Sequence, residues 1–456
     1  MSEALLVGNN LAVLVAAVEL GAAGHDVVLV TDGRAPGGHF RGLRAPGADF
    51  DLGMVLIESA GTGADGDLAT YRPRVRYDWT RFGADVDRWQ AANVQLVRTP
   101  TPEALVEGRR RPDHLVADRL DVLAEGGFTP PVPLDRADPR HAAGKVTSPV
   151  YDELGYAEAA ALNHGADIQA RLVDPFAEKL LGPAREALLA RYHRAGWLPL
   201  YWPETLAAAC EGQPTGLVEY PFWTTASGFV GDVVRSLETR LAGMPNVQVR
   251  DATVTALSLD GPRWTVRTEG GAWSAERPVL GLAADRVHGL LGLPVPERAP
   301  GASVVLVCCL VRGEAITAPV GCLSVVDREF ATYRVTDQDA LAGLDPEEHR
   351  VVLEAGPVTA ARLKDGADVP GELVAELGRL LGVADPASDV RVVKTLAAPG
   401  AVPAPTRHSS AAEAAASDAL VAAGPGALLT GALLGGGATS MNDQVVQGLA
   451  IAAQLP

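Results

Sequence analysis

The chain has 456 residues, of which 47% are hydrophobic and 21% are charged, and its formal net charge at pH 7 is −17. These proportions exclude an intrinsically disordered chain and supply enough apolar residues for two or three domains with buried cores. The negative charge argues against nucleic acid or an anionic membrane as the main partner. No apolar stretch reaches the roughly 20 residues that a membrane-spanning helix needs.

The cysteines and the N-terminal residues indicate a cytoplasmic protein. Cys210, Cys308, Cys309 and Cys322 show neither a CxxC motif nor disulfide-like spacing, so we expect four reduced and buried thiols. The sequence enters an apolar run within its first few residues, which predicts that it has no signal peptide. The histidines are scattered, and we expect no metal site.

Residues 4–30 predict a strand, a helix and a second strand. The apolar run ALLVG is followed by an Ala- and Leu-rich stretch and then by a second apolar run, DVVLV. This βαβ pattern is typical of a Rossmann-like nucleotide-binding domain, whose first turn carries Gly-x-Gly-x-x-Gly. Gly8 fills the first of these positions, but the second and third are Asn10 and Val13.

The departures from that motif bear on cofactor binding. The second glycine lets the backbone approach a pyrophosphate, and the third lets the helix pack closely on the strand. We therefore expect the β-branched Val13 to push the helix outward. The acidic residue that would bind a ribose is expected at the end of the second strand. That position is Thr31, and Asp32 follows one residue later.

Four further segments continue the pattern along the chain. A Gly-Gly turn, GRAPGGHFRG, lies at 33–42, and DFDLGMVLIES follows at 49–59. Residues 222–241 predict a glycine turn and a helix. Residues 246–266 predict β-hairpins, with a turn at Asp260-Gly261.

The C-terminal stretch contains two further segments of this kind. Residues 278–292 read as a strand and a turn, and residues 426–455 read as a strand, a glycine turn and a final helix. Ser440 and Asp443 have the spacing of a capping box at the start of that helix. A helix N-terminus of this kind presents free N–H groups to an anion.

In this order, the segments resemble those of the FAD-dependent amine oxidase, protoporphyrinogen oxidase and phytoene desaturase superfamily. The resemblance implies an α/β (α+β) fold with a Rossmann-like FAD/NAD(P)-binding domain that is discontinuous in sequence. That domain is expected from 1–70, 222–300 and 405–456. A mixed helical and β-sheet substrate-binding domain is expected from 71–221 and 301–404, the first block helical and the second mixed.

The resemblance also implies a set of cofactor-binding positions. Gly37 and Gly38 match a turn beside the pyrophosphate, and His39 takes a place where relatives often have Arg. Val254 matches a valine whose backbone contacts the adenine, and Gly431 matches a glycine followed by an acid. In this chain that acid is replaced by Ala432. The candidate cofactor-binding residues are Gly8, Asn10, Asp32, Gly37, Gly38, His39, Val254, Gly431 and Asn442.

Four departures occur together, at Asn10, Val13, Thr31 and Ala432. Each lost charge-assisted hydrogen bond costs about 1.5–3 kcal/mol, and about 1.4 kcal/mol is a tenfold change in affinity. We interpret the pattern as an eroded FAD site in a protein that has lost flavin or no longer uses it for redox chemistry. A divergent flavoenzyme with compensating residues is the alternative. A non-catalytic binding scaffold is a third.

If flavin chemistry is gone, the fold still predicts an apolar site between two domains that can hold a lipophilic, natural-product-like small molecule in one reactive shape. A redox-neutral cyclisation or isomerisation fits that description. An FAD-dependent oxidase or dehydrogenase is the alternative activity. The oligomeric state is open.

Four residues are candidates for acid–base or oxyanion-binding roles, and each has a structural alternative. Glu58 follows an apolar strand, but it can equally be a surface residue at a strand end. His193 lies in an aromatic cluster that can line a pocket or pack in the core. Tyr333 and Arg334 resemble a strand that faces the flavin in mutase-like relatives, or they form a pair at a sheet edge.

Overall fold

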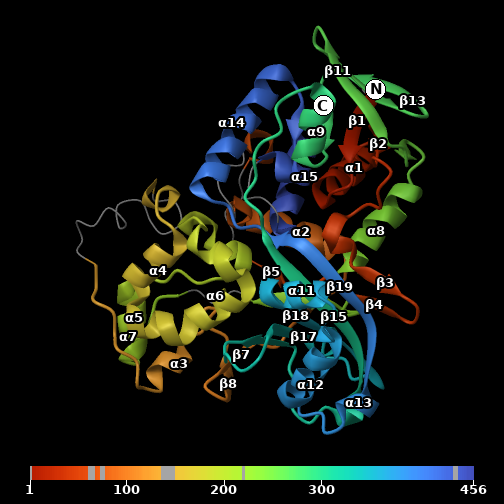
Figure 1. Ribbon diagram of the computed structural model, residues 1–456. Helices are drawn as coiled ribbons and strands as arrows, with labels where there is room; N and C mark the ends of the chain where they lie inside the picture. The colour runs from red at the N-terminus through yellow and green to blue at the C-terminus, as the bar shows by residue number, and fades with distance from the viewer. Residues whose placement is uncertain are drawn as a thin grey trace.

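The computed structural model describes residues 3–59, 67–71, 78–134, 149–217, 221–434 and 440–455. One end of the molecule, at the top of Figure 1, is built around a parallel sheet in the order β10-β2-β1-β14-β20. Its strands come from distant regions of the chain: β1 (Glu3–Gly8), β2 (Asp26–Val30), β10 (Val247–Arg250), β14 (Val279–Gly281) and β20 (Leu428–Leu429). The βαβ prediction for residues 4–30 is confirmed, as is the Rossmann-like fold assembled from separate stretches.

Two layers cover this sheet. One face packs on three helices, α1 (Leu11–Ala22), α8 (Gly231–Ala242) and α15 (Met441–Gln454), through a common apolar core. The other face packs on α9 (Ala284–Leu291), α14 (Arg407–Ala423) and a small antiparallel sheet. The strands of that small sheet are β11 (Val254–Asp260), β12 (Arg263–Thr268) and β13 (Gly271–Ala275).

The hairpin prediction for residues 246–266 is half right. β11 and β12 form an antiparallel hairpin, and Gly261 in its turn has a φ of 57°. β10, however, pairs in parallel with β2 and belongs to the main sheet. The chain reaches β10 through α8, which is the crossover that a parallel neighbour requires.

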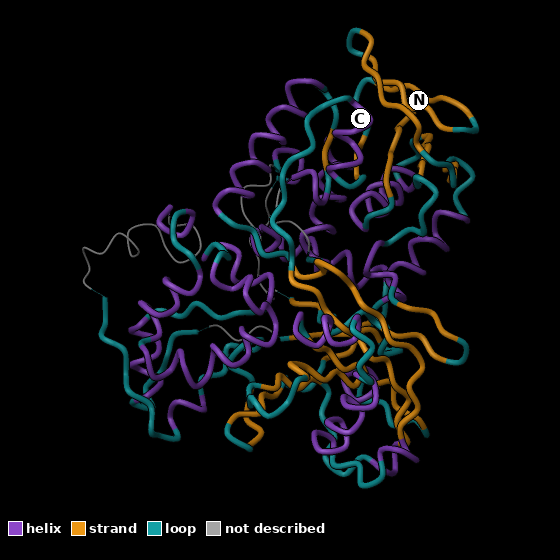
Figure 2. Tube along the Cα trace, viewed as in Figure 1, coloured by secondary structure: helices purple, strands orange, loops and turns teal. Residues whose placement is uncertain are grey.

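A second sheet of seven strands forms the other end of the molecule, in the order β19-β15-β18-β17-β16-β7-β8 (Figures 1 and 2). Its strands are β7 (Glu103–Val106), β8 (Arg109–Pro112), β15 (Ala302–Arg312), β16 (Cys322–Val325), β17 (Thr332–Asp337), β18 (Glu348–Ala355) and β19 (Val390–Val402). One face packs against α11 (Pro357–Lys364) and α12 (Val369–Leu381). The opposite face packs against the helical block.

The first intervening segment is largely helical, as predicted, but it also supplies the strands β6 (Leu96–Arg98), β7 and β8. The helical block consists of α3 (Asp121–Ala124), α4 (Tyr156–His164), α5 (Ala166–Ile168), α6 (Asp174–Leu181) and α7 (Pro203–Cys210), whereas α2 (Gly83–Asn93) packs with α8 and α15. Short elements complete the described fold: β3 (Leu43–Ala45), β4 (Ala48–Phe50), β5 (Ile57–Glu58), β9 (Phe222–Thr225), α10 (Gln338–Leu341) and α13 (Pro386–Asp389). The exact domain boundaries remain a prediction.

Val13 does not need to displace helix α1, contrary to expectation. A Cβ atom on Gly281 of the neighbouring strand β14 would lie only 2.3 Å from Val13 Cγ2. Gly281 therefore supplies the space that the missing third glycine of the motif would have supplied. Gly448 of α15 makes room for Val15 in the same way, because a Cβ there would lie 2.5 Å from Val15 Cβ. Helix α1 packs closely on β14 and α15 because the glycines lie on these two elements and not on α1.

Three further sequence expectations can be compared with the structure. Cys308, Cys309 and Cys322 are buried free thiols, but Cys210 is only half-buried because it ends helix α7. Among the helices that the structure describes, none combines the length and apolarity needed to cross a bilayer. No group of His, Cys, Asp and Glu side chains in the described ranges has the arrangement of a metal site.

The packing of Gly281 against Val13 predicts a compensated pair. We expect Gly281→Ala to lower the free energy of unfolding by about 1–3 kcal/mol, the usual cost of overpacking a core. Val13→Ala in the same chain should recover some of that loss. Gly289→Ala, in helix α9 with nothing within 4 Å of the added Cβ, is the matched control and should be neutral or stabilising. Chemical denaturation measures all four proteins, and equal costs for the two glycine variants would contradict the account.

Candidate functional site

The first turn of the nucleotide domain is closed by the side chain of Asn10. Its Oδ1 accepts a hydrogen bond from Val13 N at 3.0 Å and so caps helix α1. Its Nδ2 donates to Gly281 O at 3.1 Å and to Thr430 Oγ1 at 2.9 Å. A Cβ on Gly431 would lie 2.8 Å from the same nitrogen. Asn10 thus fills the space between the ends of β1, β14 and β20, where the motif would place a glycine.

Other backbone donors at this edge are also taken by side chains of the chain. Gln444 Oε1, from helix α15, accepts a hydrogen bond from Leu11 N at 3.0 Å. Gln447 Oε1, one turn further along α15, accepts from Gly431 N at 2.8 Å. The first N–H group of helix α1 and that of the glycine turn would otherwise be available to an anion.

The two residues expected to contact an adenosine, Asp32 and Val254, are hydrogen-bonded to each other. Asp32 is buried with a φ of 58°, and its Oδ1 accepts a hydrogen bond from Val254 N at 2.7 Å. Arg286 lies 3.3 Å from the same carboxylate oxygen and also donates to Val254 O. The backbone groups of Val254 and the Asp32 carboxylate therefore satisfy one another. Thr31 Oγ1 donates to Asp251 Oδ1 at 2.9 Å.

The Gly-Gly turn lies beside the first turn, as the motif order implies. Gly37 N donates to Asn9 O at 2.6 Å, and Gly37 and Gly38 both have positive φ values, 96° and 57°. A Cβ on Gly37 would lie 2.6 Å from Val234 of α8, whereas Gly38 faces open space. His39 is exposed, with its ring against Phe40. The cofactor-binding role of this turn remains a prediction.

The start of the last helix is confirmed at Ser440, whose side chain accepts a hydrogen bond from Asp443 N at 3.1 Å. The candidate Asn442, in its first turn, is buried. Its Nδ2 donates to Glu58 O at 2.6 Å, and its Oδ1 accepts from Gln90 Nε2 at 2.7 Å. Asn442 therefore joins α15 to β5 and α2.

Two of the four acid–base candidates, Glu58 and His193, lie in different elements from the other two. Glu58 is half-buried at the end of β5, next to Phe222 of β9. His193 is buried in a 3₁₀ helix (Ala190–Gly196), where its Nδ1 lies 2.6 Å from Leu198 O. Its ring is stacked on Tyr156 with centroids 6.4 Å apart. These contacts favour the core-packing interpretation of His193.

The other two candidates are brought together by a β-bulge. Thr332 pairs with Ala355 and Arg334 with Glu354, so Tyr333 is the extra residue in β17. Adjacent strand residues normally point to opposite faces, but a bulge re-aims one of them. Tyr333 and Arg334 consequently both contact Glu354 of β18. Tyr333 Oη donates to Glu354 Oε2 at 2.9 Å, and Arg334 Nη1 lies 3.5 Å from that oxygen.

This cluster of Tyr333, Arg334 and Glu354 lies in an apolar environment. All three side chains are at least nine-tenths buried, and the Arg334 guanidinium lies 5.6 Å from the centroid of the Phe176 ring. Burial is the largest single influence and lowers the pKa of Arg334, but the neighbouring acidic groups, led by Glu354, together outweigh it and hold the pKa above its usual value. Burial raises the pKa of Tyr333 well above its usual value, and Glu354 adds to this. The cluster therefore holds a charged guanidinium and a neutral phenol.

Arg334 has hydrogen-bonding capacity left over. Its Nε and Nη2 atoms are buried and have no hydrogen-bond partner in the described structure. Thr332 Oγ1 and Thr336 Oγ1, on the same strand, are also buried without a hydrogen-bond partner in the described structure. Buried donors without partners are rare in proteins, and such groups commonly bind an internal water or a ligand.

The bulge is held from both faces of the sheet at Thr332. Lys179 Nζ, from α6, donates to Thr332 O at 3.0 Å and to Asp327 O at 3.1 Å. Glu376, from α12, accepts from Thr332 N at 2.9 Å and from Ala331 N at 2.8 Å. Burial lowers the pKa of Lys179 to about 7. These contacts fix the backbone immediately before the bulge.

Sequence reasoning missed Glu354 and a neighbouring acid, Asp113. Asp113 Oδ2 accepts a hydrogen bond from Ser324 Oγ at 2.6 Å, and Ser324 pairs with Arg334 across the sheet. The available signal was a lone Glu in the otherwise apolar run VVLEAG of β18. A buried acid in such a run requires a partner, and Arg334 is that partner.

No family model and no curated protein matches the sequence. Solved structures match its fold over nearly the whole length. A reduced UDP-galactopyranose mutase is 14% identical with a TM-score of 0.64 over 99% of this chain and 95% of that chain. A protein assigned as a protoporphyrinogen oxidase from Exiguobacterium sp. 255-15 is 15% identical, with a TM-score of 0.60 over 99% and 97%.

Cyclohexylamine oxidase from Brevibacterium oxydans IH-35A is also 15% identical, with a TM-score of 0.58 over 99% of this chain and 98% of that chain. These names belong to the superfamily that the motif order resembles, so the expected flavoenzyme fold is confirmed. Identities this low show a shared fold and leave the activity to be argued from the site.

The buried pair of Arg334 and Glu354 predicts a large loss of stability when one partner is removed. Glu354→Gln leaves the guanidinium buried without its counter-charge, and we expect it to cost about 3–5 kcal/mol. Glu329→Gln removes the exposed partner of Arg379 and should cost less than about 1 kcal/mol. Urea denaturation at neutral pH measures both variants. A cost for Glu354→Gln as small as that of the exposed control would contradict a charged, buried cluster.

Proposed function

We propose that the protein is an enzyme on a flavoprotein oxidoreductase fold that catalyses a redox-neutral cyclisation or isomerisation of a lipophilic small molecule, without FAD as a redox group. The observation that carries this proposal is the internal pairing of the dinucleotide-binding edge. Asn10, Gln444 and Asp32 satisfy the groups that a dinucleotide would otherwise contact. The substrate end of the molecule retains a buried polar cluster.

The residues present do not fit FAD in the binding mode that the resemblance implies. A pyrophosphate approaching helix α1 would have to displace Gln444 from Leu11 N and meet the Asn10 carboxamide. An adenine reaching the Val254 backbone would have to break its contacts with Asp32 and Arg286. Each of these exchanges forfeits a hydrogen bond worth about 0.5–1.5 kcal/mol, or up to about 3 kcal/mol where a charge is involved. Together they offset much of the affinity that the cofactor would gain.

The cluster of Tyr333, Arg334 and Glu354 supplies what redox-neutral chemistry needs. Arg334 offers unpartnered donors to an oxygen on which negative charge develops, and such stabilisation is strongest in an apolar environment. Tyr333 holds a proton at Oη, and Glu354 Oε2 is the acceptor already in contact with it. In the proposed reaction, Arg334 polarises a carbonyl or enol oxygen of the substrate. Tyr333 and Glu354 move the proton that a ring closure or double-bond shift requires.

The likeness to a mutase is compatible with this type of reaction. A mutase is an isomerase by name, and a reduced UDP-galactopyranose mutase is among the structures that share the fold. Net redox change is therefore not a requirement of proteins with this architecture.

An FAD-dependent oxidoreductase is the second candidate, and one observation favours it. Gly8, Gly37 and Gly431 keep positive φ values at the turns where relatives contact the cofactor. The two amine or porphyrinogen oxidases that share the fold support the same candidate. A flavin bound in a displaced mode would use these turns without the Asn10 position.

The two candidates differ in flavin content. We expect the protein purified from a flavin-sufficient host to contain much less than one flavin per chain, because its dinucleotide edge is internally paired. The absorption spectrum of the purified protein and the flavin released on denaturation measure this. A yellow protein with one FAD per chain would contradict the proposal and favour the oxidoreductase.

The reaction type can be tested before the substrate is known. Incubating the protein with fractionated lipophilic extracts, in the absence of oxygen and added flavin, should convert one component into a product of unchanged mass. We expect Tyr333→Phe and Arg334→Lys to lower that conversion at least tenfold, since each alters a group that handles a proton or an oxyanion. Arg328→Gln, an exposed arginine outside the cluster, is the control and should be fully active.

Mass spectrometry of the time course separates the alternatives. A product lighter by two hydrogens, or conversion only when FAD is supplied, would contradict the redox-neutral reaction. Binding of a component without any conversion would instead indicate a non-catalytic scaffold.

A further inference from the structure

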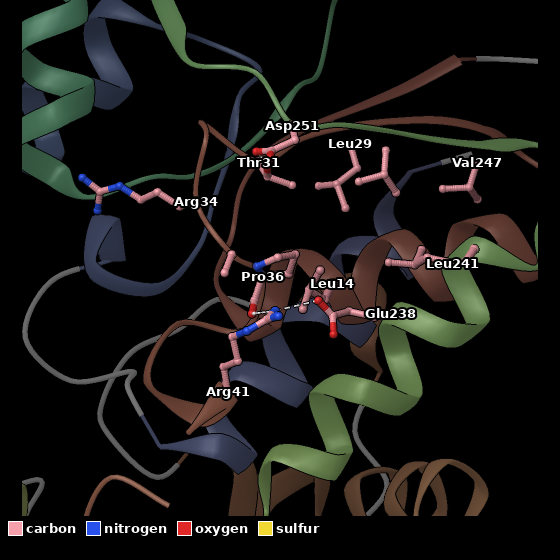
Figure 3. A pocket seen from close by; sticks show the side chains of 13 residues that line it. Leu14, Leu29, Thr31, Arg34, Pro36, Arg41, Glu238, Leu241, Val247 and Asp251 are labelled. Carbon is pink, nitrogen blue, oxygen red and sulfur yellow. Dashed lines mark hydrogen bonds and ion pairs between the residues drawn. The ribbon is translucent and has the colours of Figure 1, made fainter. Parts of the chain in front are cut away.

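A recess opens on the nucleotide domain between helices α1 and α8, the edge strand β10 and its neighbour β2 (Figure 3). Its volume is about 590 Å³, within the range of sites that hold small organic ligands. The loop that follows β2 forms one rim. The recess therefore lies on the helical face of the parallel sheet, at the carboxyl ends of its two outermost strands on this side.

The floor and walls of this recess are apolar. Leu14, Leu29 and Leu241 are buried side chains that face it from α1, β2 and α8. Val249 of β10 lines it as well, and 44% of its surface is exposed. Val247, on the same edge strand, is half-buried. An exposed valine beside a concave apolar floor is surface that an apolar ligand would remove from water.

Two pairs of polar side chains lie at the sides of the recess. Arg41 Nη1 lies 2.7 Å from Glu238 Oε1 at one side, and Figure 3 draws this contact as a dashed line. Thr31 Oγ1 donates to Asp251 Oδ1 at the other side. Arg34 extends from the rim away from the apolar residues in Figure 3. An occupant would therefore meet apolar side chains, one ion pair and the exposed Asp251 carboxylate.

The recess adjoins the predicted dinucleotide site, because Thr31, at the position expected to bind the ribose, lines it. None of the candidate cofactor-binding residues lines it. Leu29 and Val27 of β2 face α1 and α8, whereas Val28 and Val30 face the opposite layer, where Val254 lies. A ligand in the recess would contact the first of these two faces.

We propose that this recess is a binding site for an uncharged lipophilic small molecule. Its apolar body would cover Val249 and Leu29, the Arg41–Glu238 ion pair would flank it without requiring a counter-charge, and the exposed Asp251 carboxylate would stay in solvent. A charged headgroup gains little here, because burying it beside groups that are already paired carries a desolvation cost. The inference does not depend on the proposed reaction, since it concerns a different region of the fold.

Binding of N-phenyl-1-naphthylamine, an uncharged probe whose fluorescence rises in apolar surroundings, tests the site in the full-length protein. We expect saturable binding that Ala242→Phe weakens at least tenfold, because Ala242 is exposed on α8 and lines the recess. Thr239→Phe, at an exposed position of the same helix outside the recess, is the matched control and should bind as the wild type does. Unchanged thermal unfolding of both variants shows that they remain folded.

Competition defines the ligand class. We expect decan-1-ol to displace the probe at lower concentration than decanoate or decylamine, with Arg34→Gln making no difference. Absence of saturable binding, or equal binding to the Ala242→Phe and Thr239→Phe variants, would overturn the site. Displacement led by decanoate and lost in Arg34→Gln, or displacement led by decylamine, would overturn the uncharged class.

Discussion

The carboxamide of Asn10 is the contact on which the nucleotide end of this molecule depends. One side chain caps helix α1 and bonds to the ends of β14 and β20, so it joins three strands that are far apart in sequence. In the corresponding glycine motif this space is left open for a cofactor. The Asn10 side chain fills this space and itself makes hydrogen bonds that a dinucleotide would otherwise make. The helix can remain close because Gly281, on the partner strand, has no side chain.

The proposed chemistry is assigned to one buried polar cluster, which lies on the seven-stranded sheet. There the bulge at Tyr333 turns two neighbouring side chains toward Glu354, and contacts from Lys179 and Glu376 hold the backbone in front of it. The sheet thus positions a cation, a phenol and a carboxylate in a buried site, and Met54 N, from the block expected to belong to the nucleotide domain, donates to Glu354 Oε1 at 2.9 Å.

Much of the fold could be predicted from the sequence, because its signals are local. The apolar runs and Ala-rich stretch of residues 4–30 give the first βαβ unit, and the spacing of Ser440 and Asp443 marks the start of the last helix. The prediction that β10 belongs to a hairpin was wrong. Alternating apolar residues indicate a strand but not the strand with which it pairs, and the choice between hairpin and parallel pairing depends on α8.

The site was harder to predict, since its contacts join residues that are distant in sequence. Tyr333 and Arg334 were identified by resemblance, but Glu354 could be placed beside both only through the bulge, which alternation along a strand does not show. Likewise, the glycine that accommodates Val13 lies in another strand, about 270 residues away in sequence. The pairing of Asp32 with Val254 is also a long-range contact.

Titration calorimetry with FAD tests the central claim most directly, using the wild type and an Asn10→Gly/Gln444→Ala variant. If these side chains occupy the cofactor's place, the wild type should bind FAD weakly or not at all. The variant, with its first turn opened and Leu11 N released, should then bind at least tenfold more tightly. Stoichiometric, tight binding by the wild type, unchanged or weakened in the variant, would contradict the account.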